Sequence, residues 1–224
     1  MCYYCDMSAI SLDKLKDNLH SQRLLPSQKI FLEDIEGNFG KIKKLGINDL
    51  KALFNILKNK DKIKELADRT GIDIKYLTVL KREVSSYHPV SRKIADFSKI
   101  SDDIKQKLLA MGIKTTKHLF TYVATKAAIK KLVADIGISQ DDALMLAKLC
   151  DVSRLRYVNC DFAQLLVRSK YDTVEKIKTA DYMKLYEELK ALNEGNRYYT
   201  GHIGPKDMEF LVRDKPNADV VMEF

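Results

Sequence analysis

Apolar residues recur along this chain at the three- and four-residue spacing of helices, and no segment shows the sustained alternation of a strand. Leu12, Leu15 and Leu19 share one face of a predicted helix that follows Ser11. The helix predicted over 139–150 carries a similar apolar stripe and opens on a sequence typical of a helix start. The pattern therefore predicts an all-α protein with essentially no sheet.

The apolar pattern repeats itself after 66 residues. The sequence of residues 45–54, LGINDLKALF, returns at 111–120 as MGIKTTKHLF, and the register continues into the predicted helices that follow. A third, more diverged copy follows the second at an offset of 58, where residues 158–166 align with 100–108. We therefore predict three consecutive copies of one helical unit, because a repeat of this kind determines architecture before any single motif does.

Turn and capping residues keep the same register as the apolar positions. Gly46 and Gly112 are predicted to end one helix, since glycine accepts the left-handed backbone of a helix C-cap. Asp49, Thr115 and Thr173 are predicted to begin the next helix, each with a side-chain oxygen that accepts a backbone hydrogen bond. In the third copy a lysine, residue 170, occupies the glycine position. This agreement supports one helical unit used three times.

The repeat also predicts the domain boundaries. The strongest linker signal is the segment 85–91, where serines and a proline interrupt the periodicity. The predicted parts are an N-terminal segment with one helix, two repeats, and a diverged third repeat with a tail: 1–26, 27–88, 89–157 and 158–224. The sequence leaves open whether the repeats form one rigid core or hinge near Pro89.

Local signals refine the prediction within the copies. Residues 36–38 are predicted to form a tight turn, followed by a short helix over 39–45. Pro26 suits the first turn of a helix, where its missing N–H is not needed. Residues 193–201 are expected to be a polar loop specific to the third copy, and the chain from 217 onward a frayed tail.

The unit of short helix, tight turn, short helix and Gly-Ile turn resembles a helix-hairpin-helix (SAM-like) module, in outline at 35–47 and 100–113. The chain also resembles, over residues 27–215, a bacterial family of unknown function built from tandem helix-hairpin-helix repeats. The residues that carry this likeness lie in the segments 66–72, 151–158, 162–166, 172–177 and 189–193. The resemblance implies an all-α fold of three tandem repeats behind an N-terminal helix, and it brings no known activity.

Composition and charge add a modest preference for an anionic partner. The 39 basic residues exceed the 31 acidic ones, which gives a net charge of +8 and favours nucleic acid among partners. The two signs are interspersed, however, as in many soluble proteins without such a partner. No apolar run is long enough to cross a bilayer and no secretory signal opens the chain, so we expect a cytoplasmic protein with reduced cysteines.

In the hairpins that the repeats resemble, turn glycines let backbone N–H groups approach a phosphate, and lysines on the next helix supplement them. The first copy offers the best candidate residues for such a contact: Gly37, Asn38, Gly40, Lys41, Lys43 and Lys44. The carboxylate of Glu36 opposes it, and the corresponding turns at 101–103 and 159–161 carry acidic residues instead of glycines. A second candidate is Gly204 with Lys206, although Pro205 between them is also typical of a helix start. A purely structural role is the alternative for every one of these turns.

Two further groups of residues have both a structural and a functional interpretation. The lysines of 58–64 are more typical of a solvated helix face than of a binding site. Four tyrosines could stack on nucleic-acid bases, but helical spacing favours core packing for the first two: Tyr182, Tyr186, Tyr198 and Tyr199.

The sequence predicts no cofactor and no metal. Cys2 and Cys5 have the spacing of half a zinc site, but no second Cys/His pair follows, and Cys150 and Cys160 are far away in sequence. Signatures of phosphate-binding loops, serine hydrolases and zinc proteases are absent, so we expect a protein that is not an enzyme.

The sequence therefore supports two functions. The first is binding of DNA or RNA through its phosphate backbone, without sequence specificity, which the repeat type and the net charge favour. The alternative is a protein-interaction scaffold, which the degenerate turn glycines favour. Oligomeric state and the identity of the partner are left open.

Overall fold

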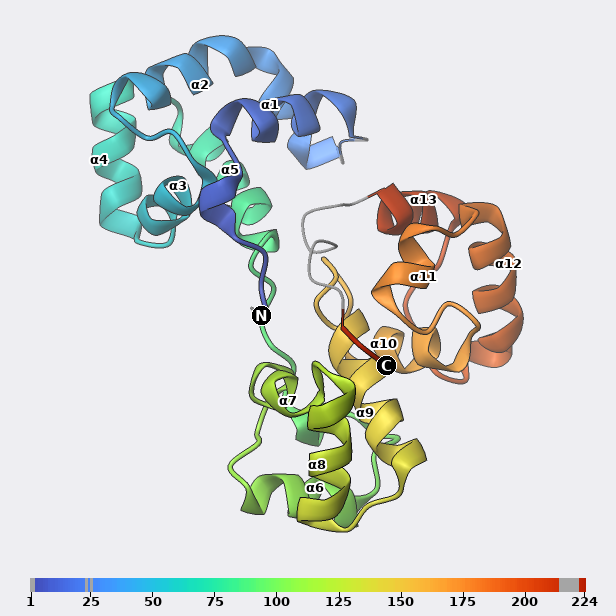
Figure 1. Ribbon diagram of the computed structural model, residues 1–224. Coiled ribbons are helices and arrows are strands. Elements are labelled where there is room, and N and C mark those ends of the chain that lie inside the picture. Colours follow the sequence, from blue (N-terminus) through green and yellow to red (C-terminus); the bar gives the residue numbers. More distant parts are fainter. Residues whose placement is uncertain (1–2, 23, 25, 214–221) are drawn as a thin grey trace. The chain divides into compact units, whose positions relative to one another are not determined.

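The computed structural model describes residues 3–22, 24, 26–213 and 222–224 of the chain, and its elements are shown in Figure 1. The chain divides into two compact units. The first unit is Asp6–His88, and the second is Pro89–Phe224 together with the described residues before Asp6. All elements of the described residues are helices, which confirms the all-α prediction, whereas the assignment to helix-hairpin-helix repeats stays a prediction.

Within the described residues, the first unit contains five α-helices and two 3-10 helices. In chain order they are η1 (Met7–Ala9), α1 (Leu12–Ser21), η2 (Pro26–Glu33), α2 (Ile35–Lys44), α3 (Leu50–Leu57), α4 (Lys60–Thr70) and α5 (Ile74–Ser86). The predicted apolar face of α1 is buried in full, since Leu12, Leu15 and Leu19 are each 0% exposed. The other helices of this unit also bury apolar residues, among them Leu50 and Leu53 of α3.

The described part of the second unit contains eight α-helices and two short 3-10 helices. They are η3 (Ile94–Asp96), α6 (Asp102–Ala110), α7 (Thr116–Val123), α8 (Lys126–Ile136), α9 (Gln140–Val152), α10 (Cys160–Arg168), α11 (Val174–Lys178), α12 (Tyr182–Leu192), η4 (Glu194–Asn196) and α13 (Pro205–Arg213). One continuous cluster of buried apolar residues runs from Ile94 to Met222 and includes Tyr3. The segment before Asp6 thus contributes to a core built mainly from residues after Pro89.

The repeat seen in the sequence is also a repeat of helices. Helices α3, α4 and α5 return 66 residues later, with the same lengths, as α7, α8 and α9. Gly46 and Gly112 both have left-handed backbones, with φ of 80° and 76°, as their places after a helix require. Asp49 and Thr115 cap the next helix by accepting N–H groups of Ala52 and His118. The predicted caps and turn glycines of the first two copies are confirmed.

Each of these two copies is paired with a short segment that precedes it in the chain. In the first unit, Leu12 N donates to Asn48 O at 3.0 Å and Leu50 N to Ile10 O at 2.8 Å. The second unit has the equivalent pair, in which Ile94 N bonds to Lys114 O and Thr116 N to Arg92 O. These pairs form two isolated antiparallel bridges. In the first unit, α1 and η2 lie between the bridge and α2. In the second unit, only η3 lies between the bridge and α6.

The third copy departs from the first two at its turn. Helix α10 ends at Arg168, and the next residue, Ser169, has an extended backbone with φ of −85° and ψ of 171°. Lys170 is not among the described residues with positive φ. No left-handed residue is therefore required where the other copies have glycine, although Thr173 still caps α11 by accepting Lys176 N.

The prediction of a tight turn over 36–38 is wrong. Asp34 caps α2 with its carboxylate, which accepts Gly37 N at 3.2 Å, and the helix runs without interruption through these residues to Lys44. Pro26 begins a 3-10 helix, and α5 extends to Ser86, into the predicted linker. The predicted tail falls largely on residues outside those that the structure describes.

Candidate nucleic-acid interface

Several backbone N–H groups at the first turn, between α2 and α3, donate hydrogen bonds within the chain. Gly46 N donates to Lys43 O at 2.9 Å, which closes the end of α2. Leu50 N donates to Ile10 O of the preceding segment, and Ala52 N donates to the Asp49 carboxylate at 2.8 Å. A phosphate that approached these N–H groups would have to displace these bonds.

The equivalent turn between α6 and α7 is engaged in the same way. Gly112 N donates to Leu109 O and Ile113 N to Leu108 O, both at 2.9 Å. His118 Nδ1 accepts from Lys114 N at 3.4 Å. These bonds satisfy the end of α6 and leave the turn with a structural role.

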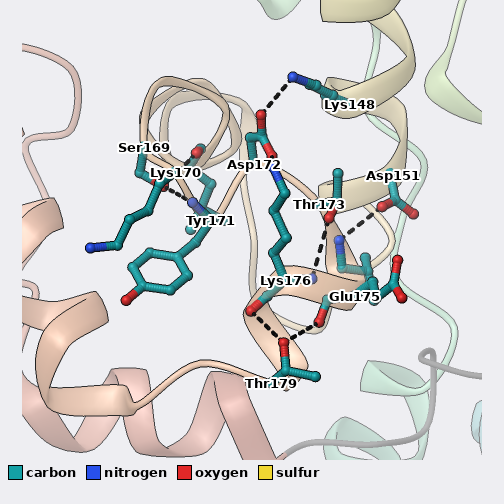
Figure 2. A network of polar contacts seen from close by, with 12 residues as sticks. Lys148, Asp151, Ser169, Lys170, Tyr171, Asp172, Thr173, Glu175, Lys176 and Thr179 are labelled. Carbon is teal, nitrogen blue, oxygen red and sulfur yellow. Dashed lines mark hydrogen bonds and ion pairs between the residues drawn. The ribbon is translucent and has the colours of Figure 1, made fainter. Parts of the chain in front are cut away.

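The third turn, between α10 and α11, is held by a network of side chains (Figure 2). Lys170 N donates to the Glu188 carboxylate at 2.6 Å, and Tyr171 N donates to Ser169 Oγ at 3.0 Å. Val174 N, at the start of α11, donates to the Asp151 carboxylate at 2.8 Å. This turn is therefore bonded to α9 and α12 through its own amides.

Two carboxylates in this network lie in different electrostatic environments. Asp151 is 3% exposed and pairs with the equally buried Arg154. Burial raises the pKa of Asp151 above its ordinary value, against the opposing effects of Arg154 and of Val174 N. Asp172 is also desolvated, but hydrogen bonds from Lys148 at 2.6 Å and Lys176 at 2.7 Å outweigh this and hold its pKa below the ordinary value (Figure 2). Both acids serve to attach the third copy to α9.

The predicted candidate residues Gly37, Asn38 and Gly40 lie inside α2 and not in a turn. Gly37 gives its N–H to Asp34, and a Cβ added at Gly37 would meet that carboxylate. Asn38 is buried. Gly40 is different, because a Cβ added there would meet nothing within 4 Å. Backbone amides of this segment are thus unavailable to a ligand, and only its side chains face outward.

The candidate lysines at the end of α2 divide into paired and unpaired groups. Lys43 forms an ion pair with Asp13 of α1 at 2.8 Å. Glu36, expected to oppose a phosphate, pairs with Lys16 at 2.7 Å, so its charge is locally balanced. Lys41 and Lys44 are exposed and form no ion pair within the described residues.

Helix α4 packs against α2 and carries the lysine-rich segment noted in the sequence. Its buried face consists of Ile63, Leu66 and Ala67. Three of its lysines are exposed and have no carboxylate partner in the part of the chain that the structure describes: Lys60, Lys62 and Lys64. The first unit therefore carries unpaired cations on two neighbouring helices.

Gly204 and Lys206, the other candidate pair, lie in the second unit at the start of α13. Pro205 begins this helix, in agreement with its structural interpretation. Gly204 is buried and its N–H donates to Asp207 Oδ2 at 2.9 Å, whereas Lys206 is exposed. The carboxylate of Asp207 thus occupies the place that a phosphate would take on the Gly204 amide.

The four tyrosines considered for base stacking pack, half-buried, against the core of the second unit. Around Tyr198 the structure gathers three basic groups that the sequence did not single out: Lys99, Arg168 and Arg197. Only the adjacency of Arg197 and Tyr198 was visible in the sequence, because the other two residues come from distant segments.

The cysteines give no indication of a metal site. Cys150 and Cys160 are free thiols, and Cys2 lies outside the described residues. Among the described residues, no group of three or more His, Cys, Asp or Glu side chains could hold a metal ion. Burial raises the pKa of the Cys150 thiol, which disfavours the thiolate that would bind a metal. None of the described helices is long and apolar enough to cross a membrane.

Comparison with known proteins gives a match for part of the second unit. Residues 98–207 match the model of a family described as a domain of unknown function (DUF4332). No curated protein and no solved structure matches the chain. The matched region runs from just before α6 into the first turn of α13. A domain-of-unknown-function family is therefore supported over 98–207, and its composition of tandem helix-hairpin-helix repeats stays a prediction.

Proposed function

We propose that this protein is a non-enzymatic binder of nucleic acid that contacts the phosphate backbone without base specificity. The contact surface is the set of exposed, unpaired lysines on α2 and α4 of the first unit. Backbone contacts of this kind position a protein on nucleic acid and carry no sequence information. The proposal moves the predicted contact from turn amides to lysine side chains.

One observation carries the proposal. Lys60 and Lys64 lie one turn apart on α4, and Lys126 and Lys130 occupy the same positions of α8 in the second repeat. All four are exposed, and none forms an ion pair within the described residues. Like charges at this spacing weaken a helix by a few tenths of a kcal/mol, roughly 0.2–0.5. The helix does not need this lysine pair for its stability, yet the pair recurs in both repeats. A polyanionic partner explains the recurrence.

Lys41 and Lys44 extend this basic surface. They lie in the last turn of α2, where positive charge also interacts favourably with the helix dipole. A structural benefit therefore explains part of their presence. The lysines at the start of α4 have no such benefit, because positive charge is unfavourable near a helix N-terminus.

A second candidate function is a protein-interaction scaffold. It is favoured by the turns themselves, because in all three copies several of their amides are bonded to the chain. In that function the lysines would only keep the surface solvated, and binding to nucleic acid would be undetectable.

Fluorescence anisotropy with labelled DNA and RNA, at several salt concentrations, tests the proposal. The full chain should lose affinity steeply as salt rises, since each lysine–phosphate contact releases counterions. The variant Lys60→Glu/Lys64→Glu should reduce the logarithmic slope by about two and weaken binding more than about tenfold.

Lys14→Glu/Lys75→Glu is the matched control, because it changes the same net charge at two exposed lysines of the first unit, on α1 and α5. It should leave most of the affinity and slope in place. If both double variants lose affinity equally, a specific surface on α4 is excluded. Undetectable binding of the unmodified chain at low salt would exclude the proposed function and favour the scaffold.

A further inference from the structure

A cluster of three cations surrounds one aromatic ring in the second unit. Arg168, in the last turn of α10, places its guanidinium carbon 4.7 Å from the centre of the Tyr198 ring. The guanidinium carbon of Arg197 lies at 5.7 Å and the ammonium nitrogen of Lys99 at 5.9 Å from the same centre. We call these four residues the Tyr198 cluster. All three cations are exposed, and the ring is half-buried.

Buried amide side chains fix the segments that form the cluster. Asn193 accepts the N–H groups of Tyr198 and Tyr199 on Oδ1, at 3.0 and 2.9 Å, and donates through Nδ2 to Tyr199 O at 2.7 Å. Gln164 of α10, which is 2% exposed, accepts Lys99 N at 2.7 Å. The backbone carbonyl oxygen of Gln164 also accepts from the Arg168 guanidinium at 3.2 Å. These hydrogen bonds therefore hold the backbone at Tyr198 and at Lys99 in place, and they also hold the side chain of Arg168.

Folding alone does not account for this arrangement. Each cation–π contact at an exposed site contributes only about 0.5–1 kcal/mol. Gathering three positive charges on one ring is opposed by their mutual repulsion. Within the described residues, none of Lys99, Arg168 and Arg197 forms an ion pair with a carboxylate. Elsewhere in the same unit, basic residues such as Lys148 and Lys176 are paired.

We infer that the Tyr198 cluster is a second contact site for nucleic acid, specific for single strands. The three cations bind backbone phosphates, and the Arg168 guanidinium together with the tyrosine ring beneath it provides a stacking surface for an unpaired base or its sugar. Positive charge next to an aromatic ring is the combination that single-strand binders use, and bases in a duplex are not accessible to such a ring. This inference rests on the proposed function, but it concerns different residues in the other unit.

Anisotropy titrations of the full chain with an oligothymidylate of roughly twelve nucleotides, and with a duplex of the same length, test the inference. Arg168→Gln should weaken binding of the single strand by about threefold to tenfold and reduce its salt slope by about one. Tyr198→Leu should weaken single-strand binding to a similar extent without changing the slope. Neither variant should change duplex affinity more than about twofold.

The matched control is Arg213→Gln, an exposed arginine of the same unit that pairs with Glu209 at 3.0 Å. It removes the same charge and should leave both affinities unchanged. Circular dichroism melting identifies a variant that fails to fold, and Lys99→Gln, at an exposed residue, then gives a second measure of the site.

The outcomes separate this inference from the proposed function. If the cluster variants bind the single strand like the unmodified chain while Lys60→Glu/Lys64→Glu does not, the inference is wrong and the proposed function stands. Equal losses for duplex and single strand would also overturn it, because the site would then not distinguish them. If the unmodified chain binds no nucleic acid, both are overturned.

Discussion

The repeat in the first unit and its counterpart in the second have the same helices at the same spacing, but they differ in polar chemistry. Helices α3–α5 and α7–α9 share their lengths, their left-handed glycines and their capping positions. At the end of the last helix, however, the first repeat has Ser85 and His88 where the second has the buried pair Asp151 and Arg154. Both sets of helices thus keep the same caps, glycines and apolar positions, although their charged residues differ. The charged residues can therefore differ between the two repeats without changing the helices.

Removal of Arg154 should have the largest effect of the changes that test this comparison. Arg154→Met leaves the Asp151 carboxylate buried without its cation, and we expect the free energy of unfolding to fall by about 3–5 kcal/mol. Chemical denaturation followed by circular dichroism measures this. Arg213→Met, which breaks an exposed pair in the same unit, should cost less than about 1 kcal/mol. Similar losses for both variants would show that the buried pair contributes no more to the stability of the second repeat than an exposed pair does.

The turn glycines should show an intermediate effect that separates the first two copies from the third. Gly46→Ala and Gly112→Ala each force a side chain into a left-handed backbone, and we expect a loss of about 1–2 kcal/mol for each. Lys170→Gly should give no gain in stability, because the third turn does not use that conformation and Lys170 pairs with Glu188. Thermal unfolding compares the three variants. A stabilised Lys170→Gly protein would contradict the difference between the turns.

The smallest expected effect concerns the glycine inside α2, whose counterpart in α6 is Gln106. Gly40→Ala should raise stability by about 0.5–1 kcal/mol, because a glycine in a helix interior is unfavourable and the added Cβ meets no other atom. Gly37→Ala should instead lower stability, since its Cβ collides with the Asp34 carboxylate. Melting temperatures of the two variants should therefore shift in opposite directions. A shift of the same sign would mean that the Asp34 cap is not what requires Gly37.

The helices and their caps could be predicted from the sequence because they depend on local interactions. Asp49 and Thr115 cap through bonds that span only three residues, and the offset of 66 showed them twice. The error at residues 36–38 has a local cause as well. Gly37 indicates a turn in isolation, but here it makes room for the Asp34 carboxylate that begins the helix.

The candidate sites were less predictable because they depend on distant residues. Whether Lys43 is free or paired depends on Asp13, which lies on another helix. The Tyr198 cluster combines three segments, and no spacing in the sequence relates Lys99 to Arg168. Single-sequence patterns therefore find residues of the right type without showing which of them meet.

The burial of Tyr3 has a consequence for the order in which the protein can be completed during synthesis. Its hydroxyl lies 2.7 Å from Thr116 Oγ1, and its ring packs edge-on against Phe120. The ribosome makes these partners more than a hundred residues after Tyr3, once the whole of Asp6–His88 has been translated. Domains generally fold as units while the chain is still being made. The first unit can therefore fold while Tyr3 is still exposed, and the docking of Tyr3 becomes a late step in the maturation of the second.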